Sequence, residues 1–416
     1  MRPPTSPEQA TTSSSPEQSE PRTAWPTRAP RLESIDLLRG LVMVLMALDH
    51  TRDFFHRGAL HGIEPMALAT TTLPLYFTRW ITHFCAPVFV FLAGAGAFLS
   101  MGRGKTKSDL SWFLVSRGLW LVLLELTWVQ WCGWTFAVNW HVHWFLVIWA
   151  IGWSMIILAG LIHLPRPIIL AFGLMMIVGH NALDAIKPAS WGRADWLWQI
   201  LHAGGQFEFN ALPGFHFGAG YPLIPWIGVM ATGFCFGGLM ELDQKTRRRW
   251  LWWLGGGLSA GFVLLRLTNW YGDLRPWSAQ ASLTKTILAF LDCHKYPPSL
   301  CYLLMTLGPA LLVLAWIDGP APRLLQPLLV FGRVPLFYYL LHLPLLHAMA
   351  VLLSLIVYGH ADWLSGNPHA PVPDNAGFGL PVTYGVWIIA VLLLYPLCRW
   401  FAELKRRRHD AWLSYL

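Results

Sequence analysis

Long apolar segments separated by short polar segments recur along the chain after residue 30. A helix that crosses a bilayer needs about 20 mostly apolar residues. Ten segments approach this length and are predicted to form helices: 35–55, 82–101, 110–131, 142–163, 167–183, 219–240, 249–270, 298–317, 328–358 and 381–402. The pattern therefore predicts an all-α, polytopic membrane helix bundle of about ten transmembrane helices. Segment 328–358 is long and contains Pro335 and Pro344, so we expect a kink or a short interfacial helix before it.

The first apolar segment ends in an unusual run of ionisable residues, namely Asp49, His50, Arg52, Asp53 and His56. The 14 apolar-biased residues before this run are too few to cross a bilayer at about 1.5 Å per residue. We therefore expect the run to begin at membrane depth, where ionisable groups are functional candidates. In an alternative interpretation, the carboxylates and the arginine form an ion-paired cap where the helix surfaces.

Composition supports the membrane interpretation. Hydrophobic residues make up 55% of the chain and charged residues 12%, against about 25% charged residues in soluble domains. The 25 tryptophans fit as well, because indoles favour the membrane interface. The net charge of +8 is compatible with nucleic-acid binding, but the basic residues fall in short segments between helices. We expect the lipid bilayer, and no nucleic acid, as a partner.

The distribution of basic residues predicts the topology. With the N-terminus inside, the cytoplasmic segments hold 18 Lys and Arg residues and the opposite segments hold 7. Because basic residues favour the cytoplasmic side, both termini are predicted to be cytoplasmic. The expected organisation is a disordered cytoplasmic tail at 1–30, a transmembrane domain at 31–404 and a basic cytoplasmic tail at 405–416. Of the 16 histidines, 13 map to the outer half of the bundle or to outer loops.

The polar end of the first helix offers candidates for catalysis. Asp49, Asp53 and His56 are spaced i, i+4 and i+7 and share one helix face, with His50 on the neighbouring face. A carboxylate beside an imidazole orients the ring and raises its basicity, as general-base catalysis requires. The predicted catalytic residues are His50, Asp49, Asp53, His56, His61 and Arg52.

Other ionisable residues are predicted to contact a substrate or cofactor. Arg79 and His83 are one turn apart at the predicted start of the second helix, although Arg79 has an alternative role as an interfacial anchor. His342 falls near mid-helix, where an imidazole needs a partner or a water-filled cavity. The predicted substrate-binding residues are Arg79, His83, His342, Lys295 and Tyr296. Arg333, near the inner end of its helix, is predicted to bind a cytoplasmic anionic cofactor or, alternatively, to anchor the helix by snorkelling.

Cysteine and histidine spacing gives little indication of a metal site. The six cysteines form no CxxC pair, and the closest histidine pair is His141-x-His143. We expect no metal and no disulfide framework. His180 and Asp184 form an i, i+4 pair that is also typical of a helix cap. Two small-residue pairs are predicted to be helix-packing notches: Gly233-x-x-x-Gly237 and Gly257-x-x-x-Gly261.

Five motifs of the sequence together resemble those of one known family. They are Arg31-Leu32-x-Ser34-Ile35-Asp36-x-x-Arg39-Gly40, DHTRDFFH, FTRWITHFCAPVF, KYPPSLCYLLMTLGP and FGRVPLFYYLLHLPLLH. Over residues 31–400 the chain resembles the heparan-alpha-glucosaminide N-acetyltransferase catalytic-domain family, particularly its bacterial branch. The resemblance implies a multi-pass acyltransferase with acetyl-CoA as co-substrate. Its animal relatives deliver acetyl to an amino sugar on the far side, using a histidine that follows the first helix. In those relatives an asparagine stands where this chain has Asp49, and the histidine corresponds to His56 or His61.

The sequence thus favours a membrane acyltransferase of the bacterial cytoplasmic (inner) membrane. It would move an acetyl or similar acyl group from cytoplasmic acyl-CoA to a sugar, amino sugar or glycan acceptor on the outer side. The alternative is a proton-coupled transporter or permease, because buried Asp and His residues also serve as proton relays. The oligomeric state is left open, with a homodimer as one alternative.

Overall fold

The computed structural model describes residues 32–102, 106–209, 212–366, 370–408 and 410–416. Residues Leu32–Leu416 form one compact unit. The predicted tail at 1–30 lies outside the described residues. The unit is 72% helix and 4% strand, which confirms the predicted helical class.

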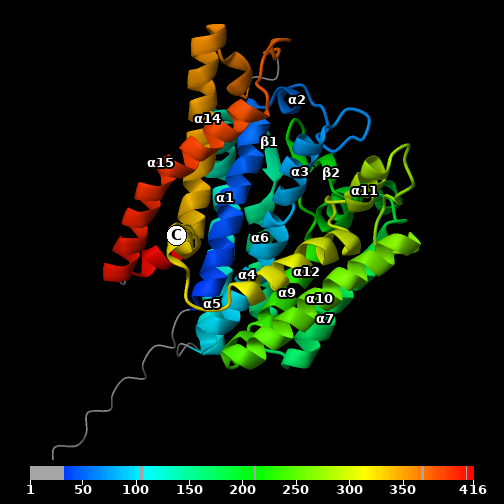
Figure 1. Cartoon of the computed structure of the whole chain (residues 1–416), viewed down its shortest axis with the longest axis vertical. Coiled ribbons are helices and arrows are strands. Elements are labelled where there is room, and N and C mark those ends of the chain that lie inside the picture. The colour runs from blue at the N-terminus through cyan, green and yellow to red at the C-terminus, as the bar shows by residue number, and fades with distance from the viewer. Residues whose placement is uncertain (1–31, 103–105, 210–211, 367–369, 409) are drawn as a thin grey trace, which may run out of the picture. The chain divides into compact units, whose positions relative to one another are not determined.

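The main helices follow the predicted segments closely, and Figure 1 shows their arrangement. They are α1 (Glu33–Phe55), α2 (Arg57–Leu60), α3 (Leu73–Thr82), α4 (Cys85–Met101), α5 (Lys107–Leu124), α6 (Val147–Leu161), α7 (Arg166–Gly179), α8 (Asp195–Trp198), α9 (Leu223–Phe236), α10 (Gln244–Thr268), α11 (Leu283–Leu291), α12 (Leu300–Trp316), α13 (Gln326–Arg333), α14 (Pro335–Tyr358) and α15 (Leu380–Arg407). The strands are β1 (Val142–Phe145), β2 (Gly205–Glu208) and β3 (His216–Ala219).

Within the described residues, seven helical stretches are long and apolar enough to cross a membrane. They are Leu73–Met101, Lys107–Thr135, Arg166–Leu183, Leu223–Glu241, Gln244–Thr268, Pro335–Tyr358 and Leu380–Arg407. Two shorter apolar helices, α6 and α12, lie among them. The chain is therefore a polytopic helical membrane protein, whereas the predicted count of ten spans and the sidedness of the termini stay predictions.

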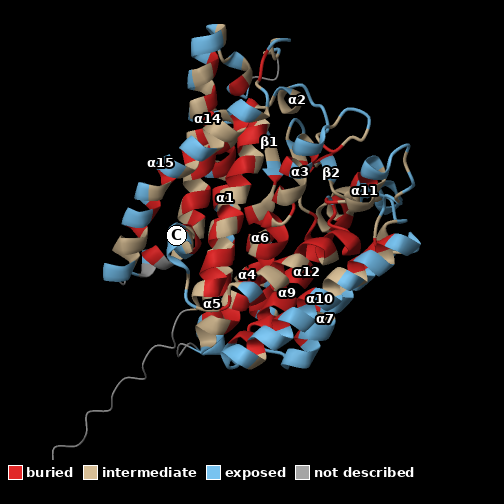
Figure 2. Cartoon of the chain, viewed as in Figure 1, coloured by how far each residue is buried: buried red, intermediate tan, exposed pale blue. Residues whose placement is uncertain are grey.

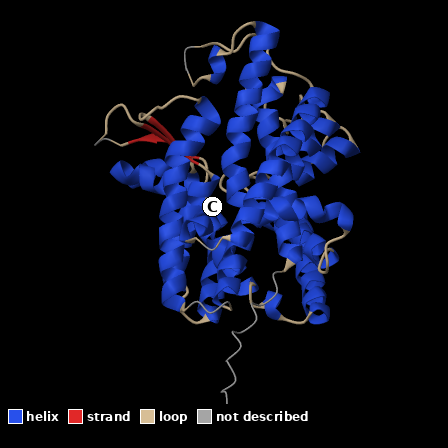
Figure 3. Ribbon diagram, turned by 90° about the vertical axis from the view of Figure 1, so that its left-hand side faces the viewer, coloured by secondary structure: helices blue, strands red, loops and turns tan. Residues whose placement is uncertain are grey.

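A small sheet interrupts two of the predicted helices. Strand β1 pairs in parallel with β3, and β2 pairs antiparallel with β3, so β3 is central. Consequently the predicted helix 142–163 begins only at Val147, and the predicted helix 219–240 only at Leu223. The four-residue strands were missed because their apolar residues merge with the following helical segments. Figure 3 shows the strands gathered on one side of the helices.

The second predicted span begins earlier than expected and contains a break. Helix α3 begins at Leu73 and ends at Thr82, so Arg79 lies in its last turn, and the prediction that Arg79 opens the second helix was wrong. Pro87 lies in the first turn of α4, where its missing N–H leaves the carbonyl of His83 without the usual i−4 donor. The buried hydroxyl of Tyr302 donates to this carbonyl at 2.7 Å instead. The break therefore turns the polar end of α3 toward the bundle.

The segment 328–358 is also divided, as its prolines predicted. Helix α13 ends at Arg333, and α14 begins at Pro335 after the extended residue Val334. Pro335 is at the first position of α14, where its missing N–H costs no helical hydrogen bond. The short preceding helix that the sequence predicted is therefore confirmed.

Helix α1 packs against α13 at the closest backbone approach of the bundle. A Cβ at Gly40 would lie 1.9 Å from the carbonyl oxygen of Leu328, and a Cβ at Gly332 would lie 1.8 Å from that of Asp36. Only glycine permits this contact. Figure 2 shows α1 largely buried and the outer face of α10 exposed.

The structure confirms one of the two predicted glycine packing notches and contradicts the other at Gly257. A Cβ at Gly233 would lie 2.1 Å from the carbonyl of Phe91, so the first pair does form a packing notch between α4 and α9. A Cβ at Gly257 would meet nothing within 4 Å, because this residue lies on the exposed face of α10. The packing prediction was wrong for Gly257, since sequence spacing does not reveal which helix face meets a neighbour.

Replacing Gly40 by alanine should destabilise the bundle by about 1–3 kcal/mol, because the added methyl group forces α1 and α13 apart. The matched control is Gly257→Ala, which adds the same methyl group on an open helix face and is expected to be neutral or slightly stabilising. Thermal unfolding of the purified proteins in detergent measures both. Equal melting temperatures for Gly40→Ala and the wild type would contradict the close approach.

Candidate active site

An ion pair between two helices organises the polar end of α1. Both carboxylate oxygens of Asp49 accept hydrogen bonds from Nη1 of Arg79, at 2.7 and 2.6 Å. Asp49 comes from α1 and Arg79 from the last turn of α3. Both side chains are more than four-fifths buried, so each charge depends on the other to offset its lost hydration. The predicted substrate-binding residue Arg79 thus lies beside the predicted catalytic residue Asp49.

Arg52 extends the Asp49–Arg79 ion pair into a polar network along α1. Its Nη2 donates to Asp53 at 2.6 Å and lies 3.3 Å from Asp49. Its other donors, Nε and Nη1, are buried and make no hydrogen bond to any described residue. Buried donors without partners are rare and costly in folded proteins. Nε–H and Nη1–H point to different sides of the guanidinium, so Arg52 presents two separate donors, each of which could bond one acceptor oxygen.

His50 joins the network through Asp53. Its Nδ1 lies 3.4 Å from a carboxylate oxygen of Asp53, within ion-pair distance, although Nδ1 makes no hydrogen bond to a described residue. The ring packs against Trp134 and His342, with ring centres 5.2 and 5.3 Å away. His50, Asp53 and Arg52 therefore form a continuous polar arrangement with the Asp49–Arg79 pair.

The predicted mid-helix histidine, His342, is completely buried next to His50. Its Nδ1 lies 2.7 Å from the carbonyl oxygen of Tyr339, which can only accept, so Nδ1 carries a proton. Its Nε2 makes no hydrogen bond to a described residue. His342 thus reaches the network as the neighbour of His50, and not as a contact of Arg79.

The two later histidines of the first segment lie beyond the end of α1. His56 caps the helix, and the backbone on either side of it pairs with Phe378. Partial burial, followed by the guanidinium groups of Arg52 and Arg57, lowers the pKa of His56 below its usual value. His61 is exposed after the short helix α2. No hydrogen bond or ion pair among the described side chains joins either histidine to Asp53.

Lys295 and Tyr296 lie in the segment that precedes α12. Lys295 is buried, and its Nζ is 5.2 Å from the centre of the Tyr296 ring. Tyr296 in turn packs edge-on against Tyr221, with ring centres 5.3 Å apart. Tyr221 was missed from the sequence, because one tyrosine carries no signal in a chain with 14% aromatic residues. Lys295 and Tyr296 form an aromatic and basic patch.

His83 and Arg333 differ in their relation to the network. His83 is buried at the break between α3 and α4, and its Nδ1 makes no hydrogen bond to a described residue. Arg333 is 43% exposed, and its Nη2 lies 3.7 Å from Glu33, the first residue of α1. Since Glu33 and Asp49 are 16 positions apart, Arg333 is about 24 Å along the helix from the network.

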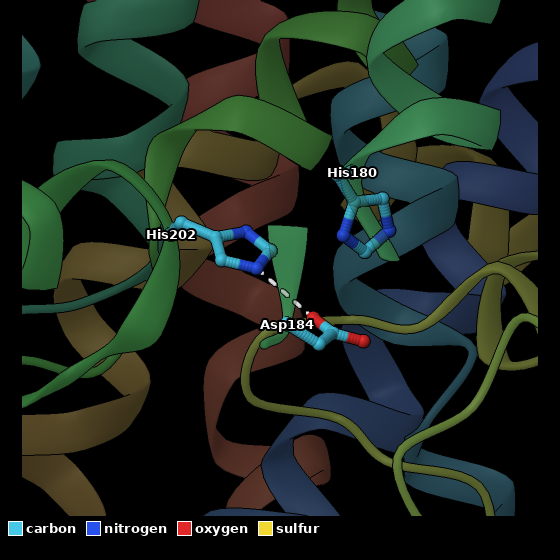
Figure 4. Close-up of side chains that lie close together, drawn as sticks. All are labelled: His180, Asp184 and His202. Carbon is cyan, nitrogen blue, oxygen red and sulfur yellow. Dashed lines mark hydrogen bonds and ion pairs between the residues drawn. The ribbon is translucent and has the colours of Figure 1, made fainter. Parts of the chain in front are cut away.

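Potential metal ligands meet outside this network, at His180, Asp184 and His202 (Figure 4). The sequence suggested only a helix cap for the first two residues. His202 was missed because it is 18 positions beyond Asp184, a spacing that belongs to no simple metal motif.

Replacing Asp49 by alanine should destabilise the protein by about 3–5 kcal/mol, because Arg79 is left as an uncompensated buried charge. The double variant Asp49→Ala/Arg79→Leu should recover part of this loss, since both charges are then absent. Thermal unfolding of the wild type, the two single variants and the double variant measures this double-mutant cycle. Glu403→Gln, which alters the exposed pair with Arg406, is the control and should change the stability little. Strictly additive effects would contradict the pairing.

A known family matches more than half of the chain. Residues 31–265 match the family described as "Heparan-alpha-glucosaminide N-acetyltransferase, catalytic". A comparison with curated proteins gives no match. The matched range covers more than half of the chain and includes α1, α3 and the network between them. The chain belongs to the heparan-alpha-glucosaminide N-acetyltransferase catalytic-domain family and is an acetyltransferase-like integral membrane protein.

Proposed function

We propose that the chain transfers an acetyl or similar acyl group from cytoplasmic acyl-CoA to an amine or hydroxyl of a sugar, amino sugar or glycan on the extracytoplasmic side. The setting would be a bacterial cytoplasmic membrane. Family membership supports acetyl transfer in general. The observation that carries the proposal is Arg52, whose two unused buried donors lie beside an imidazole–carboxylate pair.

His50 is the general base in this proposal. It removes the proton from the acceptor amine or hydroxyl as that group attacks the thioester carbonyl. Asp53 holds the imidazole and stabilises the imidazolium that forms. The C–S bond then breaks, and the CoA thiolate takes up the proton as the acyl product leaves. The proton thus passes from the acceptor through His50 to the CoA sulfur, and the acyl group passes from CoA to the acceptor.

Arg52 stabilises the oxyanion that develops on the thioester carbonyl. One of its two unbonded donors, Nε or Nη1, would bond the oxyanion, and both are already held in a buried site, so little reorganisation is needed when the charge appears. Arg79 is the other arginine of the network, but its Nη1 already donates to both carboxylate oxygens of Asp49. The Asp49–Arg79 pair therefore positions α1 against α3, and Arg52 acts on the substrate.

The acyl donor and the acceptor would approach from different ends of α1. Arg333, at the Glu33 end, is exposed and offers a cation to the phosphates of CoA. The pantetheine arm would then carry the acyl group along α1 toward the network. Lys295 and Tyr296 offer a cation and an aromatic face to a polar acceptor near Arg79.

Replacing His50 by asparagine should lower kcat by about 10²–10⁴-fold, because the general base is lost. Replacing Arg52 by alanine should lower kcat by about 10²–10³-fold, because an oxyanion donor is lost. The assay follows label from radiolabelled acetyl-CoA to a panel of amino sugars and sugars with purified protein. His163→Asn, at an exposed histidine distant in sequence from the network, is the control.

Two outcomes would contradict the proposal. The first is full activity in both His50→Asn and Arg52→Ala, which would exclude the assigned roles. The second is wild-type protein that binds no acyl-CoA and transfers no label, yet exchanges a solute across liposomes.

Replacing Arg333 by alanine should raise KM for acetyl-CoA about tenfold and leave kcat nearly unchanged, because a phosphate contact distant from the reacting carbonyl contributes equally to ground and transition states. Steady-state kinetics with varied acetyl-CoA measures both constants. Arg323→Ala, another arginine of the same region, is the control. A fall in kcat with an unchanged KM would contradict the assignment of Arg333 to the phosphates of CoA.

A further inference from the structure

A second cluster of chemically active side chains lies at the end of α7. His180 begins a 3₁₀ turn, His180–Leu183, directly after this helix, and Asp184 follows the turn. His202 comes from the π-helical turn Gln199–Ala203. Figure 4 shows the three side chains converging from these two segments. The acyl-transfer mechanism uses none of them.

The geometry of the cluster is that of three converging ligands. One ligand atom from each residue lies within 4.8 Å of the others. Nε2 of His202 is 2.9 Å from Oδ1 of Asp184, and the two imidazole ring centres are 5.7 Å apart. A tetrahedral ion about 2 Å from each atom would require separations of roughly 3.4 Å. The widest pair of ligand atoms would therefore close by at most about 1.4 Å when the ion binds.

Burial and hydrogen bonding set this cluster apart from a surface histidine pair. The His180 side chain is 1% exposed, and neither of its ring nitrogens makes a hydrogen bond to a described residue. The backbone of Pro298 approaches the ring without reaching ordinary hydrogen-bond geometry. His202 is 2% exposed, and its Nδ1 is also without a hydrogen-bond partner among the described residues. Buried imidazole nitrogens of this kind normally have a partner.

We propose that His180, Asp184 and His202 bind one divalent transition-metal ion, with Zn²⁺ as the best match. Two imidazoles and one carboxylate form a donor set that zinc uses in tetrahedral sites, with water at the fourth position. The ion gives the unpartnered nitrogen of His180 its ligand. Binding requires a lone pair on Nε2 of His202, so the proton shared with Asp184 moves to Nδ1 or is released.

The surroundings of Asp184 already hold it as a ligand. Asn181 donates to Oδ2 of Asp184 at 2.9 Å, which orients the carboxylate toward His202. The carboxylate is held by a neighbour outside the ligand set, as in built metal sites.

The ion would join two segments of the chain directly and a third through Asn181. Two ligands lie at the end of α7, and the third lies in the segment 199–203. The side-chain oxygen of Asn181 also accepts from the backbone N–H of Leu300 at 2.9 Å, at the start of α12. Lys295 and Tyr296 lie directly before this helix. The site therefore acts structurally, by fixing the segment that carries the aromatic and basic patch.

The test uses full-length protein in detergent, stripped with a chelator and reloaded with Zn²⁺ or Co²⁺ alone. We expect one tightly bound zinc per chain by elemental analysis, and a thermal unfolding temperature that rises on reloading. Co²⁺ bound at this site should give the visible absorption of a tetrahedral site with nitrogen ligands. The measurements on wild-type protein test the proposal even if a variant fails to fold.

Variants assign the ion to the cluster. His180→Ala and Asp184→Asn should each weaken zinc affinity at least tenfold by calorimetry. The matched control is the double variant His141→Ala/His143→Ala on the separate β1 segment, which removes the other close histidine pair and should retain the zinc. Wild-type protein that takes up no zinc or cobalt, or zinc lost only from the control, would overturn the proposal. These readouts do not depend on acyl transfer, so either proposal can fail without the other.

Discussion

The structure depends on the burial of the charged end of α1. Asp49 and Arg79 are charged groups from two helices, and each would destabilise the bundle severely without the other. Their pairing requires α3 to end where it does, so that Arg79 reaches α1. The break at His83, the position of Pro87 and the hydroxyl of Tyr302 together provide this ending. The break in the backbone between α3 and α4 is thus linked to the ion pair between Asp49 and Arg79.

The remaining contacts of α1 keep its charged end in place. Gly40 and Gly332 bring α1 and α13 into direct backbone contact, so the helix has little freedom to slide or rotate. His342, on α14, packs against His50 from another side. His50, Arg52 and Asp53 all lie on α1, so this helix sets their spacing, and the surrounding helices fix its position in the bundle. Preorganised donors of this kind are what acyl transfer requires.

The sequence predicted the helical bundle and the functional interest of residues 49–56, because both depend on local signals. Apolar run length defines the spans, and a charge too early in a run indicates burial. The partner of Asp49 is 30 positions away, and Arg79 was expected at a helix start and not at a helix end. The free donors of Arg52 and the contact between Asp184 and His202 depend on packing that no spacing rule encodes.

The structure also bears on whether the polar end of α1 is a helix cap or a site. The residues of a cap bond mainly to one another, near the helix end, and are wetted by solvent. Here Arg52 is only 6% exposed, and Asp49 is bonded by an arginine from another helix. A cap selected for stability would also satisfy every donor, whereas Nε and Nη1 of Arg52 are unbonded within the described residues. Because buried donors without partners are costly, these donors favour a site that a ligand completes, and the thioester oxygen of the proposed acyl donor would be such an acceptor.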